Sequence, residues 1–337
     1  MRVLIVTQMW PGPRDPDLGS FLVPHVAALR DLGHEVEVVA IAHRGGSAPR
    51  KYAGLVARAV RAARRWRPDV VLAHVLFPAG FAGLAAARVA RVPLVVMAHG
   101  TDVENCARPA LRRATAPVVR GAAAVIANSR WLADRLAGHF PGLDPVVADL
   151  GVDLDDFAPG QVPVPWPGEH PRFLCVGSLI ERKNVVRLAD AFAALGRGSL
   201  AYVGDGPLRG ALEGRPGVTV AGRIPHEQVP AWIAACDVLC QPSVREPFGL
   251  AALEGMAQER TVVATTDGGP PEFVTPEAGV LVDPADTAAL TAAMERAAAM
   301  PTPNPAARAA AQEHSVQRMA ARMSEVLAAA VAADAAS

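Results

Sequence analysis

Several features that would define a disulfide-bonded, metal-binding or membrane-spanning protein are missing from this sequence. The four cysteines form no Cys-x-x-Cys pair, and no histidine lies at metal-ligand spacing from them. They are typical of small core residues in a reducing compartment. The first apolar run, Val3 to Val6, is too short for a signal peptide or a spanning helix. We therefore expect a cytoplasmic protein without a metal site.

Aromatic residues and an excess of one charge are also scarce. Aromatics make up 5% of the chain, so its cores must consist of Val, Leu, Ala and Ile. The 33 basic and 33 acidic residues cancel, and this balance gives no support for nucleic-acid binding. Lysine is nearly absent, with Lys51 and Lys183 alone against an arginine-rich background. A site that requires an ammonium group is one reason to retain such a lysine.

At 337 residues the chain exceeds a single ordinary core and fits two α/β domains. Apolar strands, glycine-containing loops and helices alternate in both halves, which predicts two doubly wound domains facing each other across a cleft. The strands are expected at residues 2–7, 36–42, 69–74, 94–98, 122–127, 146–147, 172–176, 200–203, 218–221, 234–240, 261–265 and 279–282.

The expected domains are 1–157 and 172–315, because five prolines between Pro159 and Pro171 forbid regular structure and indicate a linker at 158–171. The Ala-rich segment 316–337 is expected to be helical, and packing back on the first domain is one arrangement open to it.

Two positions in the first half are candidate site residues. His99 directly follows the strand 94–98, and ligands bind outside the carboxyl ends of strands in open parallel sheets. Gly19 ends a long Pro- and Asp-rich loop, where it either eases the chain into a helix or belongs to a site. A structural role is the alternative for both residues.

The residues 51–67 are expected to form a basic amphipathic helix. Such a helix can contact an anionic membrane surface from the cytoplasmic side. The alternative, which we favour, is a solvated arginine face on an ordinary packing helix.

The stretch from Gln241 to Ala257 carries the strongest chemical signal. Glu246 and Glu254 are separated by a Pro-Phe-Gly turn and the start of a helix. The first N–H groups of a helix favour phosphate, and Gly249 allows a ligand to approach the main chain. Because carboxylates repel phosphate, the two acids are expected to bind hydroxyl groups of a sugar or a ribose.

Arg182 and Lys183 are expected in a loop on the same edge of the second domain as Glu246. A guanidinium and an ammonium side by side suit a diphosphate, although a solvated pair is the alternative. Because the chain has no Asp-x-Asp-like pair at a strand end, this pair and main-chain N–H groups must meet the charge of a leaving diphosphate.

These residues together resemble a retaining glycosyltransferase of the GT-B fold, in glycosyltransferase family 4. The E-x7-E pattern of Glu246 and Glu254 carries the resemblance, with the loop that ends in Arg182-Lys183 and the glycines at 268 and 269 in matching order. Asn184 departs from it, because glycine is common after the lysine.

The resemblance implies a hexose transfer from a nucleoside diphosphate sugar to a hydroxyl acceptor, small or lipid-linked, without metal or cofactor, and with UDP-sugars favoured over GDP-sugars. It implies catalytic roles for His99, Arg182, Lys183 and Glu246. It implies donor contacts for Gly19, Gly177, Arg223, Ile224, Phe248, Gly249, Leu250 and Glu254.

Two other functions are alternatives, although epimerases of this fold lack the E-x7-E segment in this form. A nucleotide-sugar epimerase of the same fold would produce a new sugar isomer from donor alone, and a non-catalytic binder would hold the donor without turning it over. A nicotinamide dehydrogenase fits poorly, because no G-x-G-x-x-G follows the first strand.

Overall fold

The computed structural model describes residues 1–336, and the chain divides into two compact units. The first contains Met1–Asp149 and the C-terminal segment from Val316, and the second is Leu150–Ser315. The Pro-rich segment 158–171 therefore lies inside the second unit, which begins ahead of the predicted boundary at 157.

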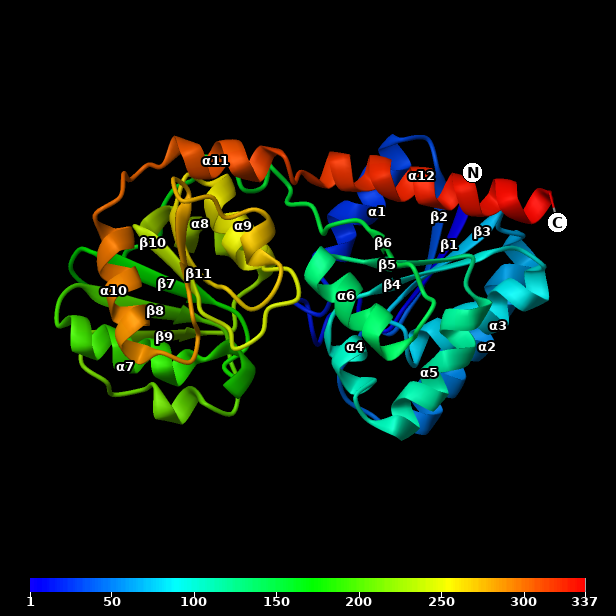
Figure 1. Ribbon diagram of the computed structural model, residues 1–337, viewed down its shortest axis with the longest axis horizontal. Helices are drawn as coiled ribbons and strands as arrows, with labels where there is room; N and C mark the ends of the chain where they lie inside the picture. The colour runs from blue at the N-terminus through cyan, green and yellow to red at the C-terminus, as the bar shows by residue number, and fades with distance from the viewer. Residues whose placement is uncertain (337) are drawn as a thin grey trace. The chain divides into compact units, whose positions relative to one another are not determined.

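The first unit is built on one parallel sheet in the order β2-β1-β3-β4-β5-β6 (Figure 1). Its strands are β1 Arg2–Thr7, β2 Glu35–Ala40, β3 Val70–His74, β4 Leu94–Ala98, β5 Ala124–Ala127 and β6 Val146–Val147. Its helices are α1 Leu22–Asp31, α2 Ala48–Trp66, α3 Ala79–Ala90, α4 Thr101–Asn105, α5 Pro109–Gly121, α6 Arg130–His139 and α12 Val316–Ala335. The strands β3 and β4 are buried along their whole length, as expected of a sheet covered on both faces.

The second unit repeats this architecture with the parallel order β12-β11-β10-β7-β8-β9. Its strands are β7 Arg172–Val176, β8 Ser199–Val203, β9 Val218–Gly222, β10 Val238–Gln241, β11 Thr261–Thr265 and β12 Gly279–Val282. Its helices are α7 Val185–Leu195, α8 Val229–Ala235, α9 Leu250–Ala257, α10 Thr287–Ala298 and α11 Pro305–Gln312, with short 3₁₀ turns η1 Glu181–Lys183, η2 Arg209–Ala211, η3 His226–Gln228 and η4 Pro270–Glu272.

Two predicted element boundaries are wrong for identifiable reasons. The basic helix begins at Ala48 instead of 51, because Ser47 takes the N-cap position and Pro49 is tolerated in a first turn. The strand expected at 234–240 begins only at Val238, because residues through Ala235 complete helix α8. The two doubly wound sheets themselves are confirmed.

The strand orders determine where ligands are expected. In each sheet the order reverses at one point, between β1 and β3 in the first unit and between β7 and β10 in the second. Crevices outside the carboxyl ends of strands at such switch points are the usual ligand sites of this fold type. In the second unit, the loops that follow β7 and β10 are therefore the expected position of a ligand.

The C-terminal helix α12 packs against α1 and also contacts strands β3 and β4. It thereby covers part of the first unit although it follows the second unit in the chain. Within residues 1–336, no helix combines the length and the apolar character needed to cross a bilayer.

Candidate active site

Glu246 lies in the loop between β10 and α9, at the switch point of the second sheet. Its side chain is 9% exposed. The carboxylate atom Oε2 lies 2.6 Å from Nζ of Lys183 and accepts hydrogen bonds from Ser243 Oγ at 2.8 Å and Gln241 Nε2 at 3.2 Å. Nη1 of Arg182 is 4.0 Å away. The loops after β7 and β10 thus meet through a buried ion pair.

The charge state of Glu246 follows from two opposing effects. Burial acts to raise its pKa, but the Lys183 ammonium lowers it, with help from Arg182 and the Ser243 hydroxyl. The net pKa of Glu246 lies below its ordinary value, so the carboxylate is ionised at neutral pH. Lys183 therefore carries a paired charge in the free protein, at the position where the sequence predicts a diphosphate.

The main chain of Glu246 is fixed by the loop after β11. Its N–H donates to Asp267 O at 3.0 Å, and Gly269 N–H donates to Glu246 O at 2.9 Å. Gly268 has φ +151°, and a Cβ there would lie 1.9 Å from Glu246 O. Only glycine permits this approach. Gly268 and Gly269 therefore allow the loop after β11 to approach and hold the main chain of Glu246.

Asn184 shows why the loop after the lysine tolerates a departure from glycine. The residue has φ 58° and precedes the first turn of α7. Asparagine adopts this left-handed conformation more readily than other non-glycine residues. Its Nδ2 also donates to Pro242 O at 3.0 Å and Pro284 O at 2.7 Å. Asn184 thus ties the lysine loop to the loop of Glu246.

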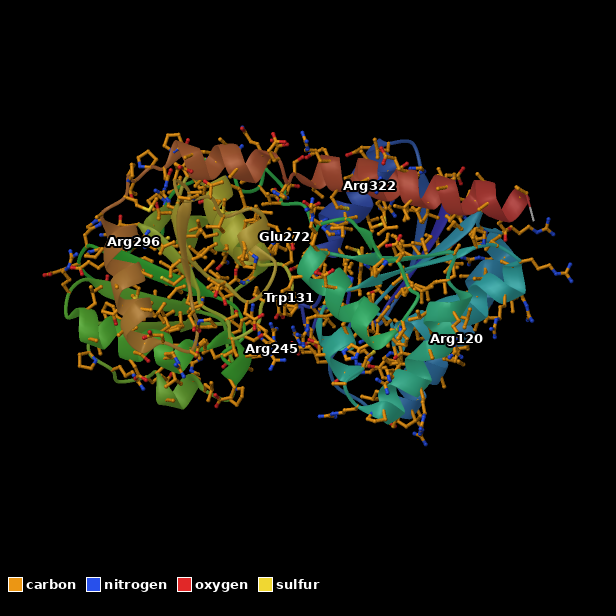
Figure 2. The ribbon with its side chains drawn as sticks, viewed as in Figure 1. Arg120, Trp131, Arg245, Glu272, Arg296 and Arg322 are labelled. Atoms are coloured by element: carbon orange, nitrogen blue, oxygen red, sulfur yellow. The ribbon has the colours of Figure 1, made fainter. Side chains whose placement is uncertain are left out.

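Arg182 is anchored on the same loop. Its Nη1 donates to the carbonyl oxygen of Arg245 at 3.1 Å, and Val244 N–H donates to Arg182 O at 2.8 Å. Arg245, labelled in Figure 2, precedes Glu246 directly. The side chain of Arg182 is 31% exposed, so part of it is open to a ligand.

Gly177 directly follows β7 and lies beside Lys183. It has φ +141°, and a Cβ there would lie 3.7 Å from Lys183 Cε. Gly204, which follows β8, approaches so closely that its own Cβ would lie 1.9 Å from Gly177 O. Both glycines therefore serve close backbone approaches at the carboxyl edge.

Glu254 lies within α9 and is 6% exposed. Its carboxyl group makes no hydrogen bond to any residue in the part of the chain that the structure describes. Burial raises its pKa to about 8, with Lys183 acting weakly in the other direction. Glu254 is thus protonated at neutral pH in the free protein. The carboxyl oxygens keep some exposure, so water or a ligand hydroxyl can reach them and supply the missing hydrogen bonds.

In the turn before α9, the side chain of Phe248 packs in the core, whereas Gly249 contributes its main chain to the start of the helix. The Phe248 ring is 5% exposed and packs 5.5 Å from the Phe273 ring, so this side chain is core. Gly249 has φ +107° and directly precedes Leu250, the first helical residue. Gln241 Oε1 accepts from Ala252 N–H at 3.0 Å and so links this helix start to Glu246.

Arg223 and Ile224 lie farther along the carboxyl edge of the second sheet. They follow β9, the edge strand, which β8 and β7 separate from β10. Arg223 is exposed and Ile224 is half-buried. They share the carboxyl edge with Glu246, and their predicted contact with a nucleobase stays a prediction.

His99 follows β4 in the first unit, as predicted. Its Nε2 lies 3.0 Å from Nδ1 of His74, the last residue of β3. Burial lowers the pKa of His99 to about 3 and also lowers that of His74. Both rings are therefore neutral at physiological pH. A neutral His99 can exchange hydrogen bonds with a ligand but cannot supply a positive charge.

Asp102 holds the turn that contains His99. Its Oδ1 accepts from the N–H groups of His99, Gly100 and Val103, and its Oδ2 accepts from Leu76 N–H at 2.9 Å. The carboxylate thereby joins the loops after β3 and β4. Burial raises the pKa of Asp102, and the backbone N–H groups act against that rise.

We expect Asp102→Ala to destabilise the protein by about 3 kcal/mol, because four buried N–H groups lose their acceptor. Urea unfolding of the full chain measures this effect. Asp102→Asn keeps one carbonyl oxygen and should cost less. Equal stability of Asp102→Ala and the wild type would contradict the assignment.

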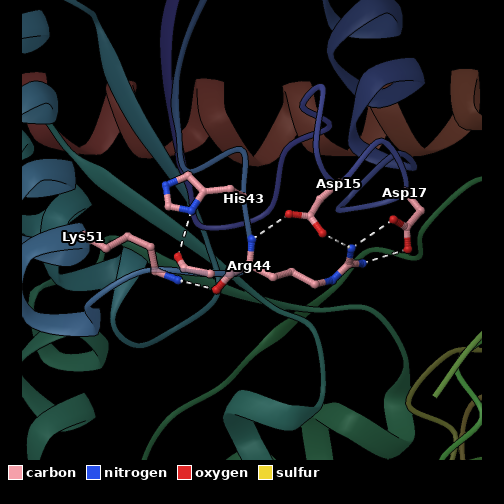
Figure 3. Close-up of polar contacts among 6 residues, drawn as sticks. Asp15, Asp17, His43, Arg44 and Lys51 are labelled. Carbon is pink, nitrogen blue, oxygen red and sulfur yellow. Dashed lines mark hydrogen bonds and ion pairs between the residues drawn. The ribbon is translucent and has the colours of Figure 1, made fainter. Parts of the chain in front are cut away.

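The loop that leads to Gly19 is held by a residue that sequence reasoning missed. Arg44 pairs with Asp15 at 2.9 Å and Asp17 at 2.8 Å, and Lys51 Nζ donates to the Arg44 carbonyl at 3.1 Å (Figure 3). Gly19 has φ +66°, and a Cβ there would lie 2.7 Å from Met9. The glycine thus meets a steric need of the loop.

The other missed residues are Gln241, Ser243, His74 and Asp102. Gln241 and Ser243 donate hydrogen bonds to Glu246. His74 and Asp102 each form a hydrogen bond with His99. A buried strand end was the available signal for His74 and Gln241, since both are the last residues of their strands.

Comparison with known protein families covers both halves of the chain. The family described as Glycosyltransferase Family 4 matches residues 2–156, and that described as Glycosyl transferases group 1 matches residues 170–299. The chain is 33% identical over 237 residues to the GDP-mannose-dependent alpha-mannosyltransferase of Mycobacterium tuberculosis, covering 65% of this chain and 61% of that protein.

A second relative is the putative teichuronic acid biosynthesis glycosyltransferase TuaC of Bacillus subtilis, with 28% identity over 243 residues, 68% of this chain and 61% of that protein. The matched part of the chain thus spans about 61% of the length of these relatives.

Solved structures show the same fold at lower identity. Sucrose-phosphate synthase from Thermosynechococcus elongatus has a TM-score of 0.82 and 20% identity, covering 98% of this chain and 99% of that one. HepE from Anabaena in complex with UDP-glucose has a TM-score of 0.73 and 22% identity, covering 98% and 100%.

Proposed function

Because this chain belongs to the group 1 glycosyltransferases of family 4, we propose that it transfers a hexose from a nucleoside diphosphate sugar to a hydroxyl acceptor with retention of configuration. In this step the acceptor oxygen forms a bond to the anomeric carbon, the bond from that carbon to the diphosphate breaks, and the hydroxyl proton leaves with the diphosphate. No enzymic nucleophile is required, which agrees with the absence of an obvious candidate from the predicted site.

The observation that carries the proposal is the buried, unpartnered carboxyl of Glu254 in the helix that follows the ionised Glu246–Lys183 pair. Glu246 lies in the loop after β10, and Glu254 lies in the helix that follows this loop, at the switch point between β10 and β7. A nucleoside diphosphate sugar has hydroxyl groups at its ribose and its hexose and charge between them. Glu254 suits the ribose, Glu246 suits the hexose, and Lys183 and Arg182 suit the diphosphate.

Lys183 has a further part in the proposed reaction. In the free protein its ammonium is neutralised by Glu246 at 2.6 Å. As the bond to the leaving diphosphate breaks, negative charge grows on the phosphate oxygens, and a fixed ammonium stabilises that charge more than it stabilises the bound donor. We propose that Lys183 and Arg182 meet this charge together with main-chain N–H groups at the start of α9, without a metal ion.

The identity of the nucleotide is open to a direct test. The Anabaena protein was solved with UDP-glucose, whereas the mycobacterial relative is named for GDP-mannose. We propose a UDP-sugar as donor. In a thermal-shift panel of UDP, GDP and ADP sugars, a donor at 100 times its dissociation constant adds about 2.7 kcal/mol of stability.

A UDP-sugar should therefore give the largest rise in melting temperature. A larger rise with a GDP-sugar would correct the base, and no rise with any sugar nucleotide would contradict the donor site. Donor incubated alone separates the alternatives, because an epimerase yields a new sugar isomer, whereas a non-catalytic binder raises the melting temperature and consumes no donor.

The cytoplasmic setting and a membrane contact through residues 51–67 remain proposals. Several cations of α2 are engaged within the first unit: Arg65 pairs with Glu37 at 2.6 Å, and Arg58 donates to Ala40 O at 3.0 Å. These contacts favour the solvated arginine face over a membrane surface.

A further inference from the structure

A cavity of about 460 Å³ lies within the first unit, between helix α5 and the end of α6. Residues of α5 line one part of it, and residues 139–143, at the end of α6 and in the loop that follows, line another. Helices α5 and α6 lead into the parallel strands β5 and β6, so the last residues of both helices lie near the amino edge of the sheet. The cavity is therefore separate from the carboxyl edge, where His99 lies.

The lining of this cavity is rich in arginine. Arg112, Arg113 and Arg120 contribute from α5, and no aspartate or glutamate lines the cavity in the part of the chain that the structure describes. All three arginines are exposed, and within residues 1–336 none of their guanidinium groups forms an ion pair. Arg120, labelled in Figure 2, is in the last turn of α5. Because like charges without a counter-charge repel one another, a bound anion would stabilise this arrangement.

Helix α6 adds positive charge beside the cavity. The guanidinium carbon Cζ of Arg135 lies 4.7 Å from the centre of the Trp131 ring, and its Nε is buried without a hydrogen bond to any described residue. Burial lowers the pKa of His139, which lines the cavity, and the charges of Arg112 and Arg135 lower it further. The ring of His139 therefore lies in the field of arginines from both helices.

The number of arginines favours a phosphate group over a single carboxylate. A guanidinium presents a planar pair of N–H donors that matches two oxygens of an anion. A phosphate monoester carries a charge of about −1.5 to −2 and three acceptor oxygens, so more than one guanidinium can bind it at once. A carboxylate carries one charge and two oxygens, which one arginine can satisfy.

Much of the remaining lining is apolar. Val119 is buried, and Phe140 and Leu143 pack against the core of the first unit while part of their surface stays exposed. The volume of about 460 Å³ falls within the range of about 300–1,000 Å³ that is usual for small-molecule sites. Contact with these side chains would stabilise an apolar group but not inorganic phosphate. The cavity thus favours a phosphate that carries an apolar group.

We propose that this cavity binds a phosphate monoester with an adjoining apolar group, through Arg112, Arg113 and Arg120, and that Phe140 and Leu143 contact the apolar part. The site is additional to the proposed donor site and does not depend on glycosyl transfer. A soluble organic phosphate and a lipid with a phosphate monoester headgroup share this chemistry, and the two sources are distinguished by the choice of probe.

Phenyl phosphate, inorganic phosphate, and phosphatidylcholine vesicles with and without phosphatidic acid are the probes. Calorimetry on the full chain measures the soluble probes, and cosedimentation measures the vesicles. Phenyl phosphate should bind more tightly than inorganic phosphate. Arg112→Gln should weaken its binding about 10-fold, because a charged pair of donors is lost. Arg112→Lys keeps the charge without the planar pair and should weaken binding about threefold.

Arg61→Gln is the matched control, because Arg61 is exposed on α2 and the change removes the same charge. It should leave binding of phenyl phosphate unchanged within about twofold. Phenyl phosphate bound at Arg182 and Lys183 would be insensitive to Arg112→Gln, so loss in this variant reports on the α5–α6 cavity. Melting temperatures verify that the variants are folded.

Binding of phenyl phosphate that depends on Arg112 would identify a soluble organic phosphate as the source. Binding to vesicles with phosphatidic acid alone, again dependent on Arg112, would identify a lipid. The proposal would be overturned by equal loss in Arg112→Gln and Arg61→Gln, by wild-type affinity of Arg112→Gln, or by the absence of binding to both phenyl phosphate and phosphatidic acid vesicles.

Discussion

Lys183→Ala should lower kcat by about 10²- to 10³-fold, the effect of removing one preorganised group that stabilises charge in a transition state. The ammonium is the nearest cation to Glu246 and one of two lysines in the chain. Its loss also leaves a buried carboxylate without its partner, and we expect a decrease in unfolding free energy of about 3 kcal/mol. Steady-state transfer assays and urea unfolding measure the two effects.

Arg197→Ala is the matched control, because Arg197 is an exposed cation just after α7 that pairs loosely with Glu295 at 3.8 Å. It should leave kcat unchanged within about twofold. Near-normal transfer by Lys183→Ala, with the protein folded, would eliminate the diphosphate assignment.

Glu254→Gln should stabilise the free protein and weaken donor binding at the same time. The folded pKa of about 8 exceeds the ordinary value of 4.5, so the folded state holds a proton that the unfolded state has lost between these values. Stability therefore falls as pH rises from 4.5 to 8 and is level above 8. Glutamine has no such cost, and at pH near 7.5 the gain should be about 4 kcal/mol.

The same substitution should lower donor affinity about 10-fold or more, because glutamine cannot lose a proton to form the charge-assisted hydrogen bonds that we expect an ionised Glu254 to make with the ribose once the donor is bound. Melting temperature and calorimetric affinity as functions of pH measure both effects. Glu295→Gln, an exposed carboxylate in the same unit, should change neither. A melting temperature for Glu254→Gln that tracks the wild type at every pH would contradict the raised pKa.

The fold could be predicted because local patterns decide it. Short apolar runs bounded by glycine and proline predicted the parallel strands, and their alternation with helices predicted two doubly wound sheets. Helix starts were less accurate. The basic helix was expected from residue 51, whereas it begins at Ala48 and includes Pro49 in its first turn, where proline is compatible with a helix.

The polar partners of the candidate site could not be predicted in the same way. His74 and His99 are 25 positions apart in the chain, and Lys183 and Glu246 are 63 apart. Their contacts arise only when strands assemble in a particular order. The raised pKa of Glu254 likewise depends on its burial, which an Ala- and Leu-rich helix suggests but does not establish.

Helix α12 gives the first unit an unusual dependence on the order of synthesis. The helix is made after the second unit, yet it packs on α1, which precedes that unit in the chain. During translation, the face of α1 that α12 covers therefore stays exposed until the entire second unit has been made. The second unit, by contrast, is continuous from Leu150 to Ser315 and can complete its own core first.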